Sequence, residues 1–260
     1  MRPVRGELSG RVVVVTRPRA RAEDLARQLR ARGARTIFAP LIKTLPPRSA
    51  RALDAALRGF ARFDAAAFAS AAAVEAFFAR ARKVLGHAPR SPRAVGAVGP
   101  ATRAALLARG WRAVSPREST GAALARALRP GPGMRVLVPR AERARPELAE
   151  GLRRAGARVS AVTAYRTVPD AAGRRALKAA LARGADAVVF ASGSAAASAV
   201  AALGRERARR AFRTCAAVAI GPTTAAELRA RAISPAALSR GTDAESLADA
   251  VVAALARRRP

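Results

Sequence analysis

The sequence predicts an α/β protein with two similar parallel-sheet α/β domains that arose by internal duplication. Runs that read as buried strands alternate with helical segments, which is the pattern of parallel sheets covered by helices on both faces. The turn at Gly99 recurs at Gly221, 122 positions later (221 minus 99). Phe68-Ala69-Ser70 recurs as Phe190-Ala191-Ser192 at the same offset. Matching segments in the same order indicate a tandem copy of one α/β unit.

A third pair of segments supports the duplication. Residues 11–35 and 135–158 both read as a strand followed by a helix, and both contain a closing Gly-Ala-Arg. The 260 residues suit two domains of ordinary size. With 51% hydrophobic but only 4% aromatic residues, the domains can bury cores made mainly of Ala, Val and Leu.

The individual elements follow from local patterns. Val12–Val15 is β-branched throughout, as expected for a strand buried on both faces. Residues 22–32 carry leucines at helical spacing before a stop at Gly33. Residues 36–45, which contain a proline, and residues 159–168 read as extended connectors. Further strands are expected at 65–69, 95–98, 136–138, 187–190 and 216–220, and further helices at 49–57, around 74–78, and at 102–108, 119–128, 146–154, 171–182, 195–203, 224–231 and 244–255.

The composition limits the class of protein and its compartment. No apolar run reaches the roughly 20 residues of a membrane span, and the first ten residues lack the apolar stretch of a secretory signal. The lone Cys215 excludes an intrachain disulfide framework and suits a reducing compartment. We therefore expect a cytoplasmic protein.

The formal net charge of +32 favours a polyanionic partner, such as nucleic acid, a membrane surface or a small molecule with many carboxylates. However, the basic residues are nearly all arginines, and they are spread over every predicted helix instead of forming one tract. Because arginine and alanine are enriched together, a biased genome composition also explains the charge. The charge alone does not choose a partner.

The turn Gly221-Pro222-Thr223-Thr224 and its counterpart Gly99-Pro100-Ala101-Thr102 suggest anion binding. We expect Gly221 to adopt a backbone conformation that residues with a Cβ resist, and Pro222 suits the first helical position. Free amides and the positive end of the helix dipole can hold an anion at such a turn. One copy would read as an ordinary strand-to-helix turn, but its repetition favours a shared role.

The usual catalytic groups are scarce. The only histidine, His87, lies in a predicted loop, and the sequence lacks metal-ligand spacings, a GxSxG elbow and the glycine motifs of nucleotide binding. Serine, threonine and arginine side chains instead follow the predicted strands, at the end where parallel sheets bind ligands. Such groups bind carboxylates or phosphates through hydrogen bonds. They are Ser70, Thr102, Arg140, Ser192 and Thr223.

Tyr165 is the only tyrosine, and it lies in the second predicted connector. Its phenol could donate a proton or a hydrogen bond, and the neighbouring Arg166 could stabilise negative charge. A tyrosine that only packs at a domain hinge is an equally common alternative.

Short motifs along nearly the whole chain, from about residue 11 to about residue 255, resemble one known family. They are Val15-Thr16-Arg17-Pro18, Ala39-Pro40-Leu41, Phe63-Asp64, and residues 68–74, 98–102, 136–140, 164–167, 190–194 and 220–224. In their order and spacing, and with the Tyr-Arg pair, they are similar to the uroporphyrinogen-III synthase family.

The resemblance implies a cofactor-free, cytosolic, usually monomeric enzyme of tetrapyrrole and haem biosynthesis. Such an enzyme cyclises hydroxymethylbilane with loss of water and inversion of ring D, through a spiro intermediate, to give uroporphyrinogen III. A transient contact with hydroxymethylbilane synthase stays open, and neither a membrane nor nucleic acid is implied as a partner.

The family fold implies two α/β domains joined by a two-stranded β-ladder hinge. Residues 1–35 with 170–260 would form the first domain, residues 49–157 the second, and residues 36–48 with 158–169 the ladder.

The resemblance also implies roles for single residues. Tyr165 matches the tyrosine proposed to assist departure of the hydroxyl group, and hydroxyl positions of the family's cleft match Thr102, Ser194, Thr223 and Thr224. The expected substrate-binding residues are Arg17, Ser70, Gly99, Pro100, Thr102, Arg140, Arg166, Ser192, Gly193, Ser194, Gly221, Pro222, Thr223 and Thr224.

Two departures from the family pattern affect these turns. Ala69 and Ala191 stand where the family often has threonine, and Gly193 stands where proline is common. The changes remove hydroxyls and are expected to add flexibility.

Two other functions stay open. A non-catalytic two-domain module that binds an anion or nucleic acid would account for the charge, although the sequence lacks the aromatic platforms of nucleic-acid binders. A periplasmic-type receptor would share two lobes and a hinge, but it would need an export signal.

Overall fold

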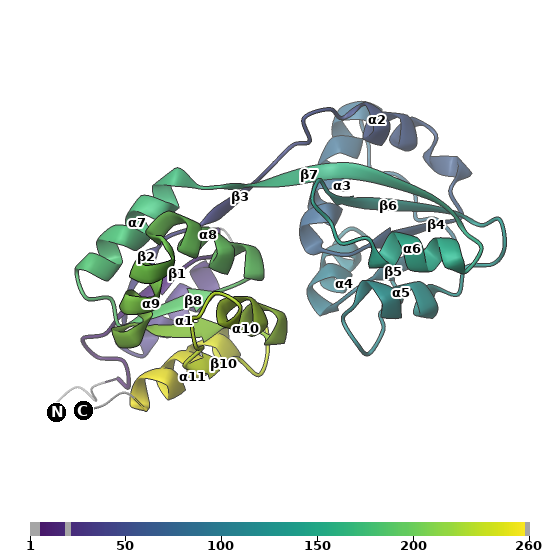
Figure 1. The fold of residues 1–260 in the computed structure, drawn as a ribbon. Helices are drawn as coiled ribbons and strands as arrows, with labels where there is room; N and C mark the ends of the chain where they lie inside the picture. The colour runs from purple at the N-terminus through teal and green to yellow at the C-terminus, as the bar shows by residue number, and fades with distance from the viewer. Residues whose placement is uncertain (1–5, 19–21, 258–260) are drawn as a thin grey trace. The chain divides into compact units, whose positions relative to one another are not determined.

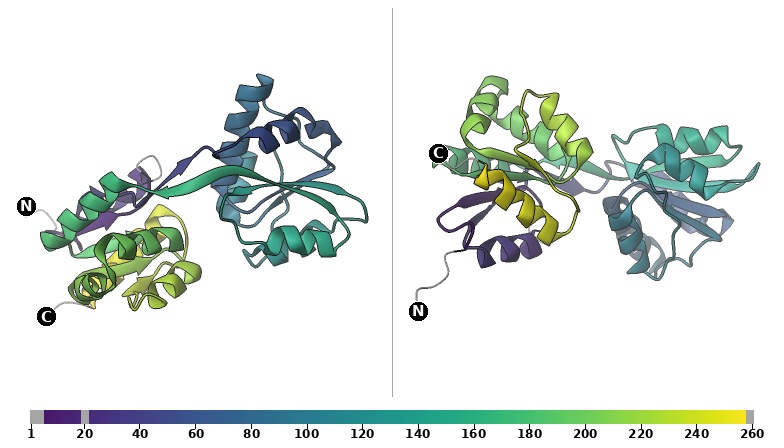
Figure 2. Two further views of the ribbon diagram at one scale, coloured as in Figure 1. Left: turned by 45° about the horizontal axis from the view of Figure 1, so that its top comes forward. Right: turned by 90° about the horizontal axis from the view of Figure 1, so that it is seen from below.

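The computed structural model describes residues 6–18 and 22–257, and its contacts divide the chain into two compact units (Figure 1). The first unit runs to Lys43 and resumes at Val168, and the second spans Thr44–Thr167. Each unit holds a five-stranded sheet with helices on both faces (Figures 1 and 2). The predicted class, two similar α/β units, is confirmed. Half of the N-terminal segment in which we see no secretory signal, residues 1–5, lies outside the described residues.

The sheet of the first unit has the order β10-β9-β8-β1-β2, and every neighbouring pair is parallel. Side chains of its central strands alternate between two fully buried faces, with Val14 and Val188 on one and Val13 and Val189 on the other. Burial on both faces explains why these strands read as continuous apolar runs. The strands are β1 (Val12–Val15), β2 (Arg35–Phe38), β8 (Ala187–Phe190), β9 (Ala216–Ala219) and β10 (Ala237–Leu238).

Helices cover both faces of this sheet. The helices α7 (Ala171–Ala182), α8 (Gly193–Leu203), α9 (Arg205–Thr214) and α10 (Pro222–Arg229) pack on the face that holds Val14. The helices α1 (Glu23–Ala31) and α11 (Ala244–Ala256) pack on the face that holds Val13. The helices that follow the neighbouring strands β1 and β8 therefore lie on opposite sides of the sheet.

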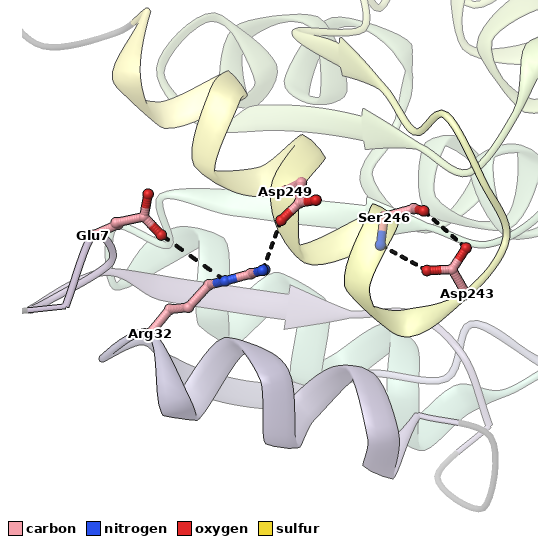
Figure 3. Close-up of polar contacts among 5 residues, drawn as sticks. All are labelled: Glu7, Arg32, Asp243, Ser246 and Asp249. Atoms are coloured by element: carbon pink, nitrogen blue, oxygen red, sulfur yellow. Dashed lines mark hydrogen bonds and ion pairs between the residues drawn. The ribbon is translucent and has the colours of Figure 1, made fainter.

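Polar contacts tie α1 to α11 at the surface (Figure 3). Arg32 lies 2.6 Å from Asp249 and 3.9 Å from Glu7. Asp243 caps α11 by accepting hydrogen bonds from the amide and the hydroxyl of Ser246, both at 2.8 Å. The bonds from Ser246 lower the pKa of Asp243.

The second unit repeats this plan around the order β3-β7-β6-β4-β5. The helices α2 (Arg51–Arg58), α3 (Ala71–Leu85) and α4 (Pro100–Leu107) cover one face, and α5 (Gly121–Leu128) and α6 (Glu147–Arg154) cover the other. The strands of this sheet are β3 (Ile42–Leu45), β4 (Ala65–Phe68), β5 (Ala94–Ala97), β6 (Arg135–Ala141) and β7 (Arg158–Pro169). The chain passes from one unit to the other within β3 and again within β7.

The duplication is visible strand by strand. The order β9-β8-β1-β2 of the first sheet corresponds to β5-β4-β6-β7 of the second. At the amino edge of the strands, Asp186 accepts the Val12 amide at 2.7 Å, and Asp64, 122 positions earlier (186 minus 64), accepts the Arg135 amide at 2.9 Å. The two carboxylates therefore perform the same structural task in both units.

Four features differ from the sequence-based expectation. The helix α9 and the short β10 were not predicted, nor was the 3-10 turn Phe60–Arg62. Residues 36–45 divide between β2, which pairs with β1 in the first sheet, and β3, which neighbours β7 in the second. The chain changes units between Lys43 and Thr44, so β2 belongs to a sheet and is not part of a linker.

An ion pair joins α2 to α3 in the second unit. Arg80 donates two hydrogen bonds of 2.6 Å to the carboxylate of Asp54. This bidentate geometry is the strongest arrangement available to the two groups. The hydrogen bonds from Arg80 hold the pKa of Asp54 below its usual value.

We expect Asp54→Asn to lower the free energy of unfolding by about 1 kcal/mol at neutral pH, a modest value because Arg80 is still 35% exposed. The pKa of Asp54 is lower in the folded than in the unfolded state. The contribution of its ionised form to the free energy of unfolding is therefore complete above the unfolded pKa of about 3.9. The contribution falls as the pH drops through the lower folded pKa. Urea denaturation of both proteins from pH 7 to pH 2 measures this difference.

The matched control is Asp24→Asn, which removes an exposed pair of Asp24 with Arg27 at 2.6 Å. This substitution should change stability by less than about 0.5 kcal/mol at any pH. A stability difference for Asp54→Asn that does not shrink in acid would contradict the assignment.

Candidate functional site

The residues expected to bind ligand gather at the carboxyl edge of each sheet. In the first unit Arg17 follows β1, residues 192–194 follow β8 and residues 221–224 follow β9. In the second unit Ser70 follows β4, residues 99–102 follow β5, and Arg140 lies near the end of β6. Because the strands of each set are parallel, all of these positions share one edge of their own sheet.

The expected ligand-binding point on each edge lies between two neighbouring strands whose following helices pack on opposite faces of the sheet. In the second unit α3 follows β4 on one face, and α6 follows the neighbouring β6 on the other. Open parallel sheets bind ligands at this switch point. Ser70 and Arg140 flank it here. Arg17 and Ser192 flank the corresponding point of the first unit, between β1 and β8.

The Gly-Pro turns leave the starts of α4 and α10 without a side-chain cap. Gly99 (φ −151°, ψ 174°) and Gly221 (φ −172°, ψ 174°) both have extended backbones that any residue adopts. The expectation that Gly221 supplies a conformation forbidden to other residues is therefore wrong. What the glycines provide is the lack of a capping side-chain oxygen. The Thr102 amide donates to the carbonyl of Gly99 at 3.1 Å, so the first-turn amides left for an anion are those of Ala101 in α4 and of Thr223 and Thr224 in α10.

The threonines of these two turns divide into buried and exposed positions. Thr102 and Thr224 are equivalent in the duplication, and they are only 5% and 4% exposed. Thr223 is exposed at the start of α10. Of the three hydroxyls, that of Thr223 is the most accessible to a ligand from solvent.

Tyr165 lies in β7 opposite Ala141, next to a shift in register between β6 and β7. It is 9% exposed and packs into the core beneath α2, α3 and α4. Its Oη lies 3.0 Å from Oγ of Ser70. The tyrosine also lines a cavity of about 290 Å³ bounded by residues 44–47, α2 and α3. Tyr165 is thus a member of the second unit's core whose phenol reaches the carboxyl edge of β4.

Three arginines of the predicted site have different surroundings. Nε of Arg140 is buried and has no hydrogen-bond partner among the described residues. Nε of Arg166 donates to the carbonyl of Pro46 at 3.2 Å, and Nη2 of Arg17 donates to the carbonyl of Thr242 at 3.2 Å. Of these three, Arg140 is the one whose buried donor still needs an acceptor.

The turn after β8 is held by hydrogen bonds and packs against α10. Ser192 caps α8 by accepting the Ala195 amide at 3.1 Å, and its Oγ lies 3.1 Å from that of Ser194. A Cβ on Gly193 would lie 3.2 Å from Cγ of Glu227. The glycine therefore permits close packing against α10.

Ser119 lies beside the candidate site, and the sequence reasoning placed it only at the start of a helix. A Cβ on Gly99 would lie 3.1 Å from its Oγ, so its hydroxyl adjoins the Gly-Pro turn. No sequence pattern pointed to this position, because it depends on the tertiary path of the chain after α4, where Val114 forms a parallel bridge with Gly96 of β5.

Neither a metal cluster nor a membrane span is found in the part of the chain that the structure describes. No group of three or more His, Cys, Asp and Glu side chains there could hold a metal ion. None of the helices there has the length and apolar character needed to cross a bilayer.

Comparison with known proteins identifies the family. The sequence model described as uroporphyrinogen-III synthase HemD matches residues 23–249. The chain belongs to the uroporphyrinogen-III synthase family. A uroporphyrinogen-III synthase from Synechococcus elongatus is 34% identical over 161 residues, which are 61% of this chain and 61% of that protein. The match to the Synechococcus elongatus protein thus spans less than two thirds of the length of that protein.

Solved structures share the fold of this synthase-family chain. A mutant uroporphyrinogen III synthase from Thermus thermophilus matches with a TM-score of 0.72 at 23% identity, covering 96% of this chain and 100% of that one. A uroporphyrinogen-III synthetase from Helicobacter pylori matches with a TM-score of 0.55 at 17% identity, covering 95% and 100%. At these sequence identities, the two matches show that the fold is shared.

The free donor of Arg140 yields a prediction about stability. We expect Arg140→Met to raise the free energy of unfolding by about 1 kcal/mol, because a buried polar group without a partner costs free energy. Arg80→Met should lower it by about 1 to 3 kcal/mol, since that change leaves Asp54 unpaired. Urea denaturation at neutral pH compares the two variants. A loss in Arg140→Met as large as in Arg80→Met would mean that Arg140 has a structural role.

Proposed function

We propose that this chain is a uroporphyrinogen-III synthase. It cyclises hydroxymethylbilane, with loss of water and inversion of ring D through a spiro intermediate, to uroporphyrinogen III in tetrapyrrole and haem biosynthesis. The observation that carries the proposal is the family match, because residues 23–249 include every proposed site residue except Arg17. We further propose that the protein acts in the cytoplasm as a monomer and needs no cofactor.

The chemistry of the substrate suits the groups at the two carboxyl edges. Hydroxymethylbilane carries eight carboxylates, and each unit offers uncapped helix amides together with hydroxyl and arginine donors. Charge-assisted hydrogen bonds from arginine are the strongest of these contacts. Arg140 is the best candidate for such a contact in the second unit, since its Nε has no other acceptor among the described residues.

The first chemical step needs an acid. The nitrogen electron pair of the pyrrole that carries the hydroxymethyl group expels the hydroxyl group. Tyr165 donates a proton to this group, so that it leaves as water. The resulting azafulvene is an electrophile. The substituted α-carbon of ring D attacks the exocyclic methylene of this electrophile to give the spiro intermediate. The older bond from that α-carbon to the methylene of ring C then breaks, and this methylene bonds to the other α-carbon of ring D, which inverts the ring. The pyrrole then loses a proton and regains aromaticity, which returns one proton for the one that the phenol gave.

The rest of the enzyme's task is to hold the substrate in one conformation. Unguided closure of hydroxymethylbilane gives the unrearranged type I isomer, so the product reports on geometry as well as on rate. Fixing the reacting ends near each other can account for most of the barrier reduction in such a unimolecular step. A large set of anion-binding groups and few acid–base groups is the site composition that this task requires.

The direct test is the isomer that forms. Purified protein is supplied with hydroxymethylbilane generated in place by hydroxymethylbilane synthase, and the oxidised products are separated by chromatography. We expect the type III isomer without added cofactor, and type I in the control without this protein. Recovery of type I alone in both reactions would reject the proposed function.

The same assay tests the role of Tyr165. Tyr165→Phe keeps the packing of the ring and removes the acid, so turnover should fall by about 100-fold. Its affinity for the product should change by less than about 2-fold, because the phenol acts on the leaving group. Unchanged turnover would remove Tyr165 from the mechanism, and an equal loss of affinity would make it a binding residue.

A further inference from the structure

We propose that Ser70 is a positioning residue for Tyr165 and not a substrate-binding residue, which revises the expectation from sequence. The inference rests on the proposed function, in which the phenol supplies the acid. It is carried by one contact, the 3.0 Å separation between Oγ of Ser70 and Oη of Tyr165. Their positions in the chain are 95 residues apart, so the fold brings them together.

The hydrogen-bonding capacity of Ser70 is used within the protein. Its Oγ accepts the Ala73 amide at 3.2 Å as the N-cap of α3. A serine hydroxyl has one donor hydrogen and two lone pairs. An acidic phenol must keep its proton for the leaving group, so in the proposed arrangement Ser70 donates its one hydrogen to Oη of Tyr165 and has no donor left for a substrate carboxylate.

Both partners are held by packed elements. Ser70 follows β4, whose four residues are buried, and its side chain is fixed by the first turn of α3. The ring of Tyr165 is held in the core beneath α2, α3 and α4. The bond therefore sets the direction of the phenol hydroxyl on an otherwise packed ring. When the phenol gives up its proton, the Ser70 hydroxyl can donate to the oxygen that becomes negative.

The duplicated unit shows that this link is an addition to the shared scaffold. Ser192, the counterpart of Ser70, caps α8 in the same way at 3.1 Å. Its hydroxyl meets that of Ser194 instead of a phenol. A cap alone therefore explains the serine in both units, and the tyrosine contact gives Ser70 its second task.

The test compares three substitutions of Ser70 with a matched cap. Ser70→Ala should lower kcat by about 10- to 100-fold and change KM by less than about 2-fold, because the acid loses its orientation while binding groups remain. Ser70→Gly removes the same hydroxyl at a smaller capping cost, and it should show the same kinetics. Ser70→Thr retains a hydroxyl and should recover kcat to within about 5-fold of the wild type.

The control is Thr120→Ala, which removes the cap of α5, a 3.1 Å bond from the Ala123 amide. It should lose a similar amount of thermal stability without a change in kcat. Because the chain has one tyrosine, ring-¹³C-labelled tyrosine gives the signals of Tyr165 alone. These signals should shift in Ser70→Ala and Ser70→Gly, and they should match the wild type in Thr120→Ala.

Two results would overturn the inference. A raised KM with unchanged kcat in Ser70→Ala and Ser70→Gly would make Ser70 a substrate-binding residue. Unshifted tyrosine signals would show that the contact does not exist in solution. Failure of the wild-type protein to form the type III isomer would reject the proposed function, and the tyrosine signals would still decide the Ser70 contact.

Discussion

Parallel strands that must be buried on both faces determine the rest of this structure. Each central strand needs helices above and below it, so the chain passes through a helix after every strand that the structure describes except β2, which leads directly to β3. The strands of a set therefore end at one edge, and the following helices begin there. The edge collects helix amides and the short polar turns that join strand to helix, and the site is built from these groups.

The two units use the same scaffold for different purposes. The shared positions are mostly structural: the aspartates at the amino edge, the serine caps of α3 and α8, and the paired buried threonines. The differences lie in the core and at the carboxyl edge. The second unit groups Phe60, Phe68, Phe77, Phe78 and Trp111 into one aromatic cluster, with Tyr165 in the same core. The corresponding face of the first unit has the aromatic pair of Phe190 and Phe212, and the buried apolar positions that α8 contributes to it are alanines.

Most of the fold was predictable because its signals are local. Buried strands are recognisable in the sequence as short apolar runs, and glycine or proline marks most helix ends. The helix α9 was missed because only Ala208 and Phe212 are buried in it, and the remaining residues are dominated by arginine. The strand β10 is two residues long, which is too short for any periodicity.

The candidate site was predictable only as a set of positions. Position after a strand was enough to select Ser70 and Arg140, because parallel topology sends such residues to one edge, whereas Tyr165 was selected as the only tyrosine, in the second predicted connector. The contact between Ser70 and Tyr165 and the unpaired donor of Arg140 depend on packing between distant segments, which no local pattern encodes. The prediction of a special backbone conformation at the turn glycine was wrong. Gly99 and Gly221 have ordinary extended backbones, and their effect on the helix start comes from the side chain that they lack.

The central proposal is that tetrapyrrole carboxylates bind at the carboxyl edge of each sheet: at the turns after β4 and β5 in the second unit, without the Ser70 side chain, and at the turns after β8 and β9 in the first. Amide NMR during titration with uroporphyrinogen III under anaerobic conditions tests it most directly. The account predicts that the largest shift changes fall on those four turns, while the amides beside Asp64 and Asp186 at the amino edges do not move. Shift changes confined to the amino edges, or to the arginine-rich surface of α9, would contradict it.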